Sequence, residues 1–522
     1  TAAVASGRTI YDAAITNTQI DEASARFDPR LTVNQSWNRN ETPSFSPLVP
    51  PRTDNYDVDA SLTKDNALGG QWRVGARANA TREPSGFSTT PSSADLSYTQ
   101  PLLRGGGLGP NLAPIVIARI DTERSYFQFK DSVQEQVRSV AEGYWSLVAA
   151  RVDVWARQQQ VKQASDAYRL ARARFETGSG NRADLAQAAT SLANFQANLV
   201  SSESNLIQRE AALRNLLGLP PADGVTLVPS SPPNADRFLP EWQTLCDLAA
   251  ERRPDLIELK LVLEADQQLL IQSRNSALPQ LDAVGLYRWN GLEGELPGGA
   301  NLAGPPGQFN DWTLGVNFSV PLGLRQSRAG LRRTELVIAR DRANLQQGLH
   351  AAVHTLATSV RAIDQAYLQY LAFKDARLAA RINLDQQLAD YRAGRVIFLN
   401  VLAAITSWGD AVSAEAASLT QYNTQLATLE RQTGTILESH GIVFVEERYG
   451  SIGPLGRMFP GACYPESLRP TDNEPRYPIA DEPAEQSFDL RTAPSFEEVT
   501  PRLLPELPYE DALPRRNWRD IP

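Results

Sequence analysis

The sequence predicts a mixed α/β chain in which one unit of half-buried strands and long helical hairpins is written twice. The first observation is a repeated reversal. The tetrapeptide that begins at Phe175 matches the one that begins at Tyr391, and the differences 391 − 175, 394 − 178 and 434 − 218 are all 216. The second is strict alternation of apolar and polar residues, which is typical of strands. The third is the spacing of apolar residues three and four positions apart, which is typical of coiled-coil helices.

The predicted elements follow one order in both copies: helix, strand, insert, strand, long helix, reversal and second helix. Each second helix ends at a glycine, Gly218 or Gly434, which is the residue expected just past a helix C-terminus. The chain divides into four segments: a first copy (residues 1–218), a connector (219–253), a second copy (254–438) and a Pro- and Glu-rich tail (439–522). We expect the tail to be extended or disordered, because its composition can bury little apolar surface.

The strands of the second copy alternate most clearly. Trp312, Leu314 and Val316 fall on one side, and Thr313 and Gly315 fall on the other. The polar side would face water in a soluble sandwich, whereas it would line the lumen in a membrane barrel. Alternation by itself leaves both architectures open.

The first copy carries an insert between its strands. Leu96 matches Val316 at 316 − 96 = 220, whereas Leu31 matches Leu281 at 281 − 31 = 250, so the first copy holds about thirty more residues. The insert, at about residues 56–82, has the pattern of a hairpin with two alternating strands. Up-and-down order then allows six strands per chain.

The longest predicted helices cover residues 115–177 and 331–393, and each would span roughly 95 Å at about 1.5 Å per residue. Within residues 126–155 the apolar side chains form a continuous seam, and Ala and Gln fill much of the remainder. Helices of this length need partner helices. A closed ring of helices and an ordinary two-helix coiled coil explain the seam equally well.

Composition and charge exclude several classes of function. The net charge of −9, the pI near 5.2 and the absence of a basic run exclude nucleic acid as a partner. The longest apolar run, residues 396–409, is shorter than the roughly 20 residues that a membrane-spanning helix needs. With three histidines and neither a nucleophile elbow nor a P-loop, the sequence predicts that the protein is not an enzyme.

Two short motifs bear on cofactors and metals. The glycine-rich segment from Arg104 to Pro110 follows a strand and precedes a helix, but Pro110 stands where the third glycine of GxGxxG belongs. We interpret this segment as a strand-to-helix bend that needs the conformational freedom of glycine. His350 and His354 lie four residues apart, yet Ala351 occupies the position of the glutamate in HExxH. We therefore expect no catalytic residue, no cofactor and no metal site.

The two cysteines, Cys246 and Cys463, are far apart in the sequence, and the pattern leaves open whether they pair. The chain begins at Thr1 without a recognisable signal peptide, so we expect the numbering to start after processing or trimming. Because residue 1 is not Cys, we expect no lipid-attachment site in this chain. Lipidation or a signal peptide before Thr1 stays open.

Three further motifs accompany the duplicated hairpins: Gln-Pro-Leu-Leu-Arg-Gly at residues 100–105, Arg-Pro-Asp-Leu at 253–256 and Leu-Pro-Gln-Leu at 278–281. Together with the paired reversals, and in this order, they resemble the TolC family of outer-membrane efflux proteins over roughly residues 10–438. The resemblance implies a homotrimer in the outer membrane of a Gram-negative-type bacterium. Each chain would give four strands to a shared barrel, or six if the inserted hairpin joins it, and the barrel would continue as a periplasmic helical tunnel with an equatorial domain. We prefer four barrel strands with an extracellular or added hairpin.

The resemblance also implies partners and a site. The channel would contact outer-membrane lipid, and would join a periplasmic adaptor protein to an inner-membrane pump of the RND, ABC or MFS type. The adaptor would dock at two helical tips, where the tunnel is also held shut. The tip residues are Gly178, Ser179, Gly180, Asn181 and Arg182 in the first copy, and Gly394, Arg395, Val396, Ile397 and Phe398 in the second.

The gate of this family often carries an acidic ring just inside the second tip. Those positions are Asn400 and Ala403 here, which places a carboxylate gate in doubt, whereas Asp184 keeps an acid near the mouth of the first tip. We expect Asp184 to pair with Arg182 or Arg395 across helices.

Two other classes compete with a channel of this kind. One is a coiled-coil scaffold of the periplasm or cell surface, whose strands form a small sandwich without a pore. The other is a general porin, although porins lack helices of roughly 95 Å. Dependence on detergent separates a scaffold from a channel. The exported substrate, the cognate pump and the role of the tail stay open.

Overall fold

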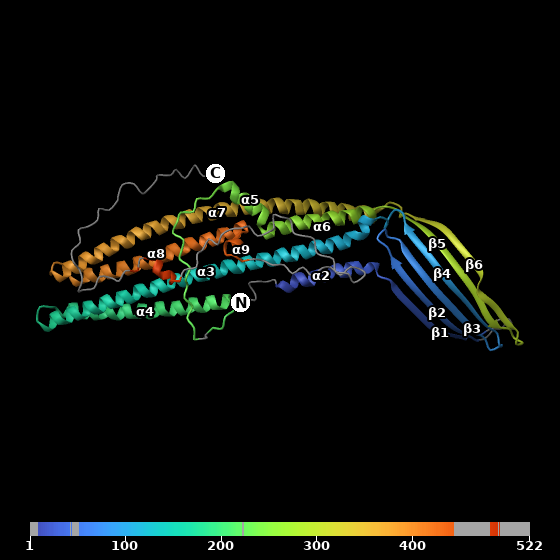
Figure 1. Cartoon of the computed structure of the whole chain (residues 1–522), viewed down its shortest axis with the longest axis horizontal. Helices are drawn as coiled ribbons and strands as arrows, with labels where there is room; N and C mark the ends of the chain where they lie inside the picture. The colour runs from blue at the N-terminus through green and yellow to red at the C-terminus, as the bar shows by residue number, and fades with distance from the viewer. Residues whose placement is uncertain are drawn as a thin grey trace. The chain divides into compact units, whose positions relative to one another are not determined.

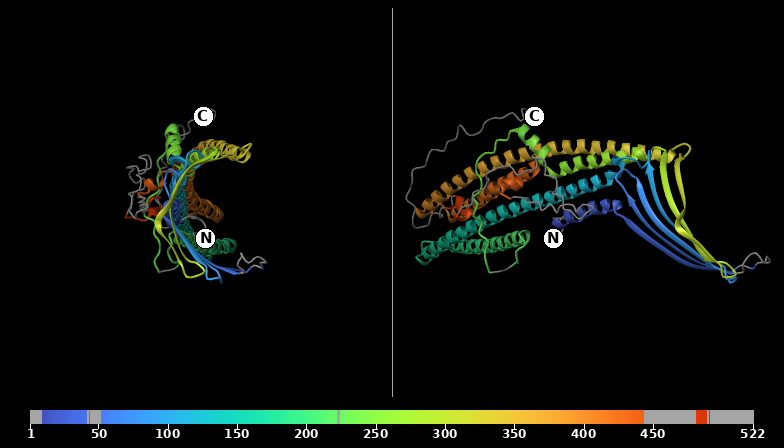
Figure 2. Two further views of the ribbon diagram at one scale, coloured as in Figure 1. Left: turned by 90° about the vertical axis from the view of Figure 1, so that its right-hand side faces the viewer. Right: turned by 45° about the vertical axis from the view of Figure 1, so that its right-hand side comes forward.

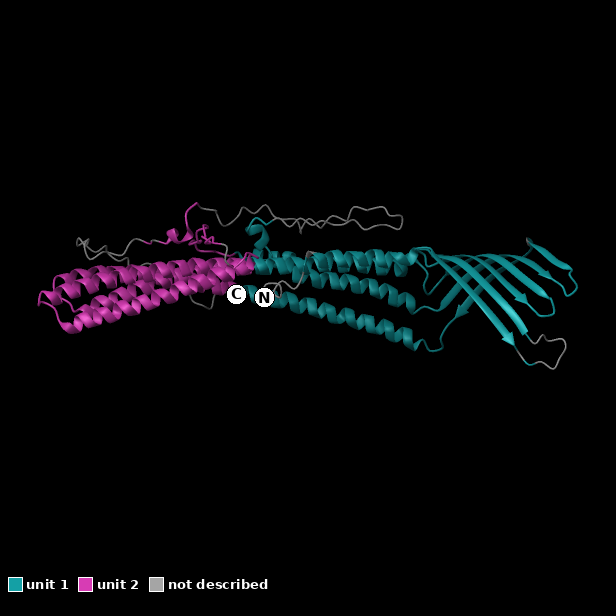
Figure 3. Ribbon diagram, turned by 90° about the horizontal axis from the view of Figure 1, so that it is seen from below, with its two compact units in different colours: residues 1–137, 241–357, 430–474 teal, residues 138–240, 358–429, 475–522 magenta. Residues whose placement is uncertain are grey.

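The computed structural model describes residues 9–41, 43, 52–221, 224–442, 481–488 and 490. The chain forms two compact units (Figure 3). Unit 1 comprises residues 1–137, 241–357 and 430–474, and unit 2 comprises residues 138–240, 358–429 and 475–522. Each unit combines segments from both predicted copies, so the segments read from the sequence are not the spatial units.

The chain alternates between a sheet and long helices (Figure 1). The helices are α2 (Ile10–Ser24), α3 (Leu108–Glu176), α4 (Arg182–Leu216), α5 (Trp242–Arg252), α6 (Pro254–Ser276), α7 (Arg325–Arg392), α8 (Phe398–Thr433) and α9 (Ile436–Ser439), with short 3-10 turns η1 (Ala25–Phe27) and η3 (Ala484–Ser487). The strands are β1 (Arg30–Glu41), β2 (Arg52–Asp65), β3 (Gln71–Arg82), β4 (Ser88–Pro101), β5 (Gln280–Glu295) and β6 (Asn301–Ser319).

Local sequence signals set several helix ends. Pro254 is the first residue of α6 and Asp255 lies in its first turn, where the helix dipole favours an acid. Gly218 and Gly434 follow the ends of α4 and α8 with positive φ angles of 70° and 75°, as the sequence predicts. In both places the glycine N–H and the next N–H donate to carbonyls of the last helical turn, which is the Schellman arrangement.

Unit 1 contains one antiparallel sheet in the order β1-β2-β3-β4-β5-β6. Its strands lead away from the ends of α2, α3, α6 and α7, and Figure 2 shows the sheet as a curved wall of tilted strands. The expectation of four strands with a separate hairpin is wrong for this sheet. β2 pairs with β1 from Thr63 back to Arg52, and β3 pairs with β4 from Gln71 to Arg82, so the inserted hairpin is continuous with its neighbours.

Glycines shape the bend between β4 and α3. Gly105 and Gly107 have φ angles of 86° and 98°, which confirms the interpretation of this segment as a strand-to-helix bend. Asn275 at the end of α6 stabilises the bend, since its side chain accepts from the Gly105 N–H at 2.7 Å and donates to the Leu103 carbonyl at 3.1 Å.

The helices of unit 1 pack through a small apolar core between α3 and α6. Ile120, Tyr126 and Phe127 of α3 contact Leu261 and Ala265 of α6, and all five are buried. Gly348 of α7 allows a close approach to α6, because a Cβ atom there would lie 2.8 Å from a methyl group of Leu259.

Unit 2 holds its helices together with buried polar groups as well as apolar ones. Asp153 of α3 accepts hydrogen bonds of 2.6 Å from Ser202 of α4 and from Ser413 of α8. The fully buried Gln160 donates to the carbonyls of Ile405 and Thr406, both at 3.3 Å. These contacts fix α8 against α3, and the buried Gln160 amide in particular is costly unless its partners stay in place.

One part of the tail is packed, unlike the expectation for residues 439–522. The backbone N–H of Ala484 donates to the Pro229 carbonyl at 2.8 Å, and Ala484 and Phe488 are buried. Glu485 pairs with Arg151 of α3, whose Nε lies 2.7 Å from its carboxylate. Most of the other tail residues, Cys463 included, lie outside the described residues. Cys246 is half-buried and carries a free thiol.

Candidate functional site

The first helical tip joins α3 to α4 in unit 2. Gly178 has a φ angle of 75°, and its N–H donates to the Phe175 carbonyl at 3.0 Å, whereas the N–H groups of Ser179 and Gly180 both donate to the Arg174 carbonyl. Asn181 then caps α4, because its side chain accepts from the Ala183 N–H at 3.0 Å. The reversal is therefore a Schellman motif followed directly by an N-cap.

The second tip joins α7 to α8 and has the same geometry. Gly394 has a φ angle of 71°, its N–H donates to the Tyr391 carbonyl at 3.0 Å, and the Arg395 N–H donates to the Asp390 carbonyl at 2.9 Å. The matched tetrapeptides in the sequence thus form matched turns. A positive φ at both glycines disfavours any residue with a branched side chain.

A contact that the sequence reasoning missed joins the two tips. The guanidinium of Arg174 lies 4.3 Å from the ring centre of Tyr391, and its Nη2 donates to the Tyr391 carbonyl at 3.2 Å. Phe398 also packs against Tyr391, with 5.5 Å between the two ring centres. Burial raises the pKa of the Tyr391 hydroxyl, which keeps it neutral, and the nearby Arg174 lowers it in part.

The outer surface of the second tip is apolar. Ile397 and Leu399 are 64% and 51% exposed, whereas Phe398 between them is buried. Gly178, Ser179, Asn181 and Arg182 are exposed on the first tip, and Gly180 is half-buried. Two exposed aliphatic side chains beside a rigid turn form a small surface suited to a partner protein.

The predicted gate pair is absent from the described part of the chain. Arg395 binds Asp390 on its own hairpin, with 2.9 Å between Nη2 and Oδ1, and no ion pair joins Asp184 to Arg182 or Arg395. Arg395 pairs with Asp390 because the turn at Gly394 brings Arg395 back over the last turn of α7. Asn400 and Ala403 lie on the exposed face of α8, and Asp184 is exposed on α4.

The sheet presents one continuous apolar face. The register places Leu31, Leu62, Val74, Leu96, Tyr287 and Trp312 in one row across all six strands. These side chains are not covered by other parts of the chain: Trp312 and Leu314 are 68% and 78% exposed. Aromatic pairs stand at two levels of this face, Trp72 against Tyr98 near the helices and Trp37 against Tyr56 at the far end. Apolar side chains bounded by aromatic ones are typical of a surface that meets lipid.

The opposite face of the sheet is polar and carries charges of both signs. Arg73 lies 3.8 Å from Asp59 on the neighbouring strand, and Arg77 lies 3.6 Å from Asp57. These atoms face the side opposite to the apolar row because side chains alternate along a strand. The two faces therefore match a wall with lipid on one side and water on the other.

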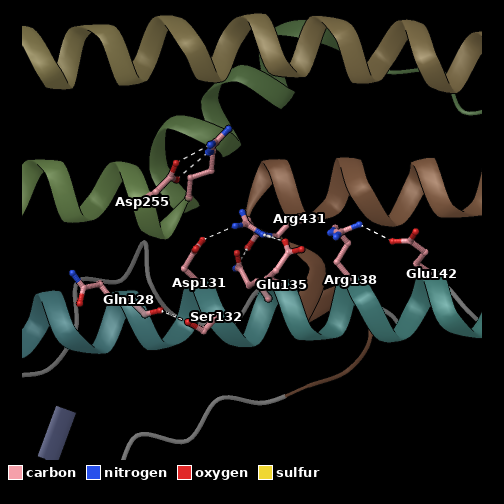
Figure 4. Close-up of polar contacts among 11 residues, drawn as sticks. Gln128, Asp131, Ser132, Glu135, Arg138, Glu142, Asp255 and Arg431 are labelled. Atoms are coloured by element: carbon pink, nitrogen blue, oxygen red, sulfur yellow. Dashed lines mark hydrogen bonds and ion pairs between the residues drawn. The ribbon is translucent and has the colours of Figure 1, made fainter. Parts of the chain in front are cut away.

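A charged cluster in unit 1 ties α8 to α3 (Figure 4). Arg431 lies 2.8 Å from Asp131 and 3.3 Å from Glu135, both on α3. Burial raises the pKa of the Asp131 carboxyl, and the charge of Arg431 only partly offsets this effect. Burial also acts on Asp255, but hydrogen bonds from Arg253 and its charge outweigh it and hold the pKa below its usual range. The ion pairs of Arg431 thus join α8 to α3, and the pair of Arg253 with Asp255 lies at the start of α6.

Two predicted absences concern metals and membrane helices. In the residues that the structure covers, no group of three or more His, Cys, Asp or Glu side chains lies close enough together to hold a metal ion. The rings of His350 and His354 instead meet edge to face, with 4.4 Å between their centres and an interplanar angle of 62°. None of the described helices combines the length and the apolar composition needed to cross a membrane.

Comparison with known proteins decides the family. The family model described as outer membrane efflux protein matches residues 12–219 and 245–435, which is more than half of the chain. This protein belongs to the outer membrane efflux protein family. The outer membrane protein TolC of Escherichia coli (strain K12) is 24% identical over 382 residues, which cover 69% of this chain and 73% of that protein. The family places the protein in the outer membrane as an efflux channel.

Solved structures of outer-membrane channels share the fold of this family member. The open state of the MtrE outer membrane channel of Neisseria gonorrhoeae superposes with a TM-score of 0.60 at 17% identity, covering 84% of this chain and 88% of that one. The outer membrane protein VceC of Vibrio cholerae gives a TM-score of 0.58 at 14% identity, and the match covers 81% of this chain and 91% of that one. The recognition of the TolC family from the sequence is therefore confirmed.

Proposed function

We propose that this protein is a homotrimeric exit duct, which passes substrates from an inner-membrane pump of the RND, ABC or MFS type and a periplasmic adaptor to the exterior. The observation that carries the proposal is the open six-stranded sheet with one exposed apolar face, joined to long helical hairpins in the same chain. Such a face is stable against lipid, and the open sheet edges need strands from other copies, because lipid cannot satisfy backbone hydrogen bonds.

The parts of the chain then take separate roles. The polar face of the sheet, with Arg73, Asp59, Arg77 and Asp57, lines the aqueous lumen in the outer membrane. The helices α3, α4, α7 and α8 from three chains form the walls of a periplasmic tunnel. The two tips at Gly178 and Gly394 close the tunnel and bind the adaptor.

The first experiment measures the assembly. The protein is extracted from membranes with and without detergent, and its mass is determined in detergent by native mass spectrometry. We expect extraction only with detergent and a mass of three chains. Extraction without detergent would support the coiled-coil scaffold instead, and a stable monomer in detergent would refute the duct.

The second experiment tests docking at the tips. Ile397→Asp places a charge on the exposed apolar surface of the second tip, whereas the matched control Ile397→Val keeps it apolar. After crosslinking in cells, we expect Ile397→Asp to recover at least tenfold less adaptor than the unmodified protein, with the same trimer yield. Equal recovery by both variants would place the docking surface elsewhere.

A further inference from the structure

The turn between β2 and β3 lies at the helical end of the sheet and is built into it. The side-chain oxygen of Asn66 accepts from the N–H groups of Leu68 and Gly70, at 3.0 and 2.8 Å. The Leu68 carbonyl in turn accepts from the Gly107 N–H at 3.1 Å and from the Gln100 side chain at 3.2 Å. The tip of the inserted hairpin is therefore hydrogen-bonded to the bend that leads into α3.

The glycines of this turn fit against the bend without spare room. Gly69 has a φ angle of 86°, and a Cβ atom there would lie 2.1 Å from the Gly105 carbonyl oxygen. A Cβ atom at Gly70 would lie 2.3 Å from the Tyr98 hydroxyl. Such close approach requires the turn to keep one position against the bend, so the hairpin is a fixed part of the sheet.

Both faces of the hairpin match the strands on either side. Leu62 and Val74 occupy the apolar row between Leu31 of β1 and Leu96 of β4. On the polar side, the ion pair of Arg73 with Asp59 joins the two hairpin strands themselves. A hairpin outside the sheet would not need an apolar face and a polar face that match those of the neighbouring strands.

The edges of the sheet are β1 and β6, each with one hydrogen-bonded neighbour in the chain. In a membrane such edges must pair, and the partner that fits is another copy of this chain, since β6 of one copy can add to β1 of the next. This step rests on the trimer of the proposed function. We propose that the trimer closes an 18-stranded barrel, three times the six strands of one chain, with β1 and β6 as the joints and the inserted hairpin inside the wall.

An 18-stranded wall changes the size of the lumen. Barrel diameter grows roughly linearly with strand number, so the lumen is about 1.5-fold wider than that of a 12-stranded barrel and resembles that of a general porin. Positively charged arginines and negatively charged aspartates line this lumen. A wide lumen lined by both charges would let hydrated polar solutes pass without a strong preference for anions or cations.

Disulfide trapping tests which strand forms the joint. In a background with Cys246→Ser and Cys463→Ser, Thr32→Cys on β1 is combined in turn with Thr313→Cys, Gly315→Cys and Asn317→Cys, which span the polar face of β6. The matched control replaces Thr32→Cys by Thr63→Cys on β2, which is on the same face and equally half-buried. We expect covalent dimers and trimers with Thr32→Cys for at least one β6 position, and none with Thr63→Cys. Crosslinking through Thr63→Cys, or none through Thr32→Cys, overturns the proposal.

Labelling tests whether the hairpin lies in the membrane. Val74→Cys and Arg73→Cys are neighbours on β3 with side chains on the apolar and polar faces. In the reconstituted trimer we expect a water-soluble maleimide to modify Arg73→Cys at least tenfold faster than Val74→Cys. Equal rates would place the hairpin in water and overturn the 18-stranded wall. Because native mass is measured on the same samples, a mass other than three chains would refute the proposed duct instead.

Discussion

The contact of Arg174 with Tyr391 allows a quantitative test of how the tips are held together. The Arg174→Ala change removes a guanidinium 4.3 Å from the ring centre and a hydrogen bond of 3.2 Å to the Tyr391 carbonyl. The ring is only 5% exposed, so a cation–π contact contributes about 1 kcal/mol, and the charged hydrogen bond contributes about as much again. The second tip should therefore open about 30-fold more often, since 1.4 kcal/mol corresponds to a factor of ten.

Hydrogen exchange measures this opening directly. In the detergent-solubilised trimer, amides of residues 391–402 should exchange about 30-fold faster in Arg174→Ala than in the unmodified protein. Arg174→Lys keeps the charge but loses the planar guanidinium, and we expect an intermediate rate. If the tips also hold the tunnel shut, single-channel conductance in bilayers should rise from the unmodified protein to Arg174→Lys and then to Arg174→Ala.

Arg172→Ala is the matched control. Arg172 lies half a turn away on α3 and pairs with Glu176 of the same helix, and both side chains are more than half exposed. An exposed pair within one helix contributes little to stability, so exchange at residues 391–402 should not change. Equal exchange in Arg174→Ala and the unmodified protein, or equal effects of both alanine variants, would refute the role assigned to Arg174.

Three further predictions concern stability. Gly178→Val or Gly394→Val places a β-branched residue at positive φ and should cost about 1 kcal/mol or more, seen as faster local exchange at the altered tip with unchanged trimer yield. Trp408→Ala removes a fully buried side chain and should cost about 3–5 kcal/mol, seen as a lower thermal midpoint of the trimer. Asp255 has a lowered pKa in the folded protein, so its ionised form stabilises the fold above the ordinary carboxyl pKa, and this contribution is lost as the pH falls through the folded value. Asp255→Asn should therefore lower the thermal midpoint at pH 7, and the difference should shrink below about pH 4.

The sequence predicts the features of this protein that depend on neighbouring residues in the chain. The positive-φ glycines at the tips and at the ends of α4 and α8 follow from Gly178, Gly394, Gly218 and Gly434, because a Schellman turn is a local structure. Alternation likewise predicts the apolar and polar faces of the strands. Motifs in order predict the family, although each of them is weak alone.

Features that depend on distant contacts were missed or predicted wrongly. The sequence predicts four strands with a separate hairpin, because nothing in residues 66–70 indicates that this turn packs against Gly105 and Gly107. A pair of Asp184 with Arg182 or Arg395 stays a prediction, and within this chain Arg395 binds Asp390 in the last turn of α7. Positions 174 and 390 correspond at the offset of 216, but this equivalence places Arg174 at the first tip and does not predict its contact with Tyr391 of the second.

The open edges of the sheet bear on how this protein reaches its final state. An isolated chain exposes a broad apolar face together with the free edges of β1 and β6 in the described sheet, and both features promote aggregation in water. In the proposed trimer, the strands of one chain gain their neighbours only on assembly, so folding of the sheet, insertion into lipid and association of the copies would be thermodynamically coupled. The fraction of folded sheet then depends on the concentration of chains, as in any obligate oligomer. Before insertion, the same apolar side chains that suit lipid are a liability in water, so the sheet is the part of the chain most exposed to aggregation.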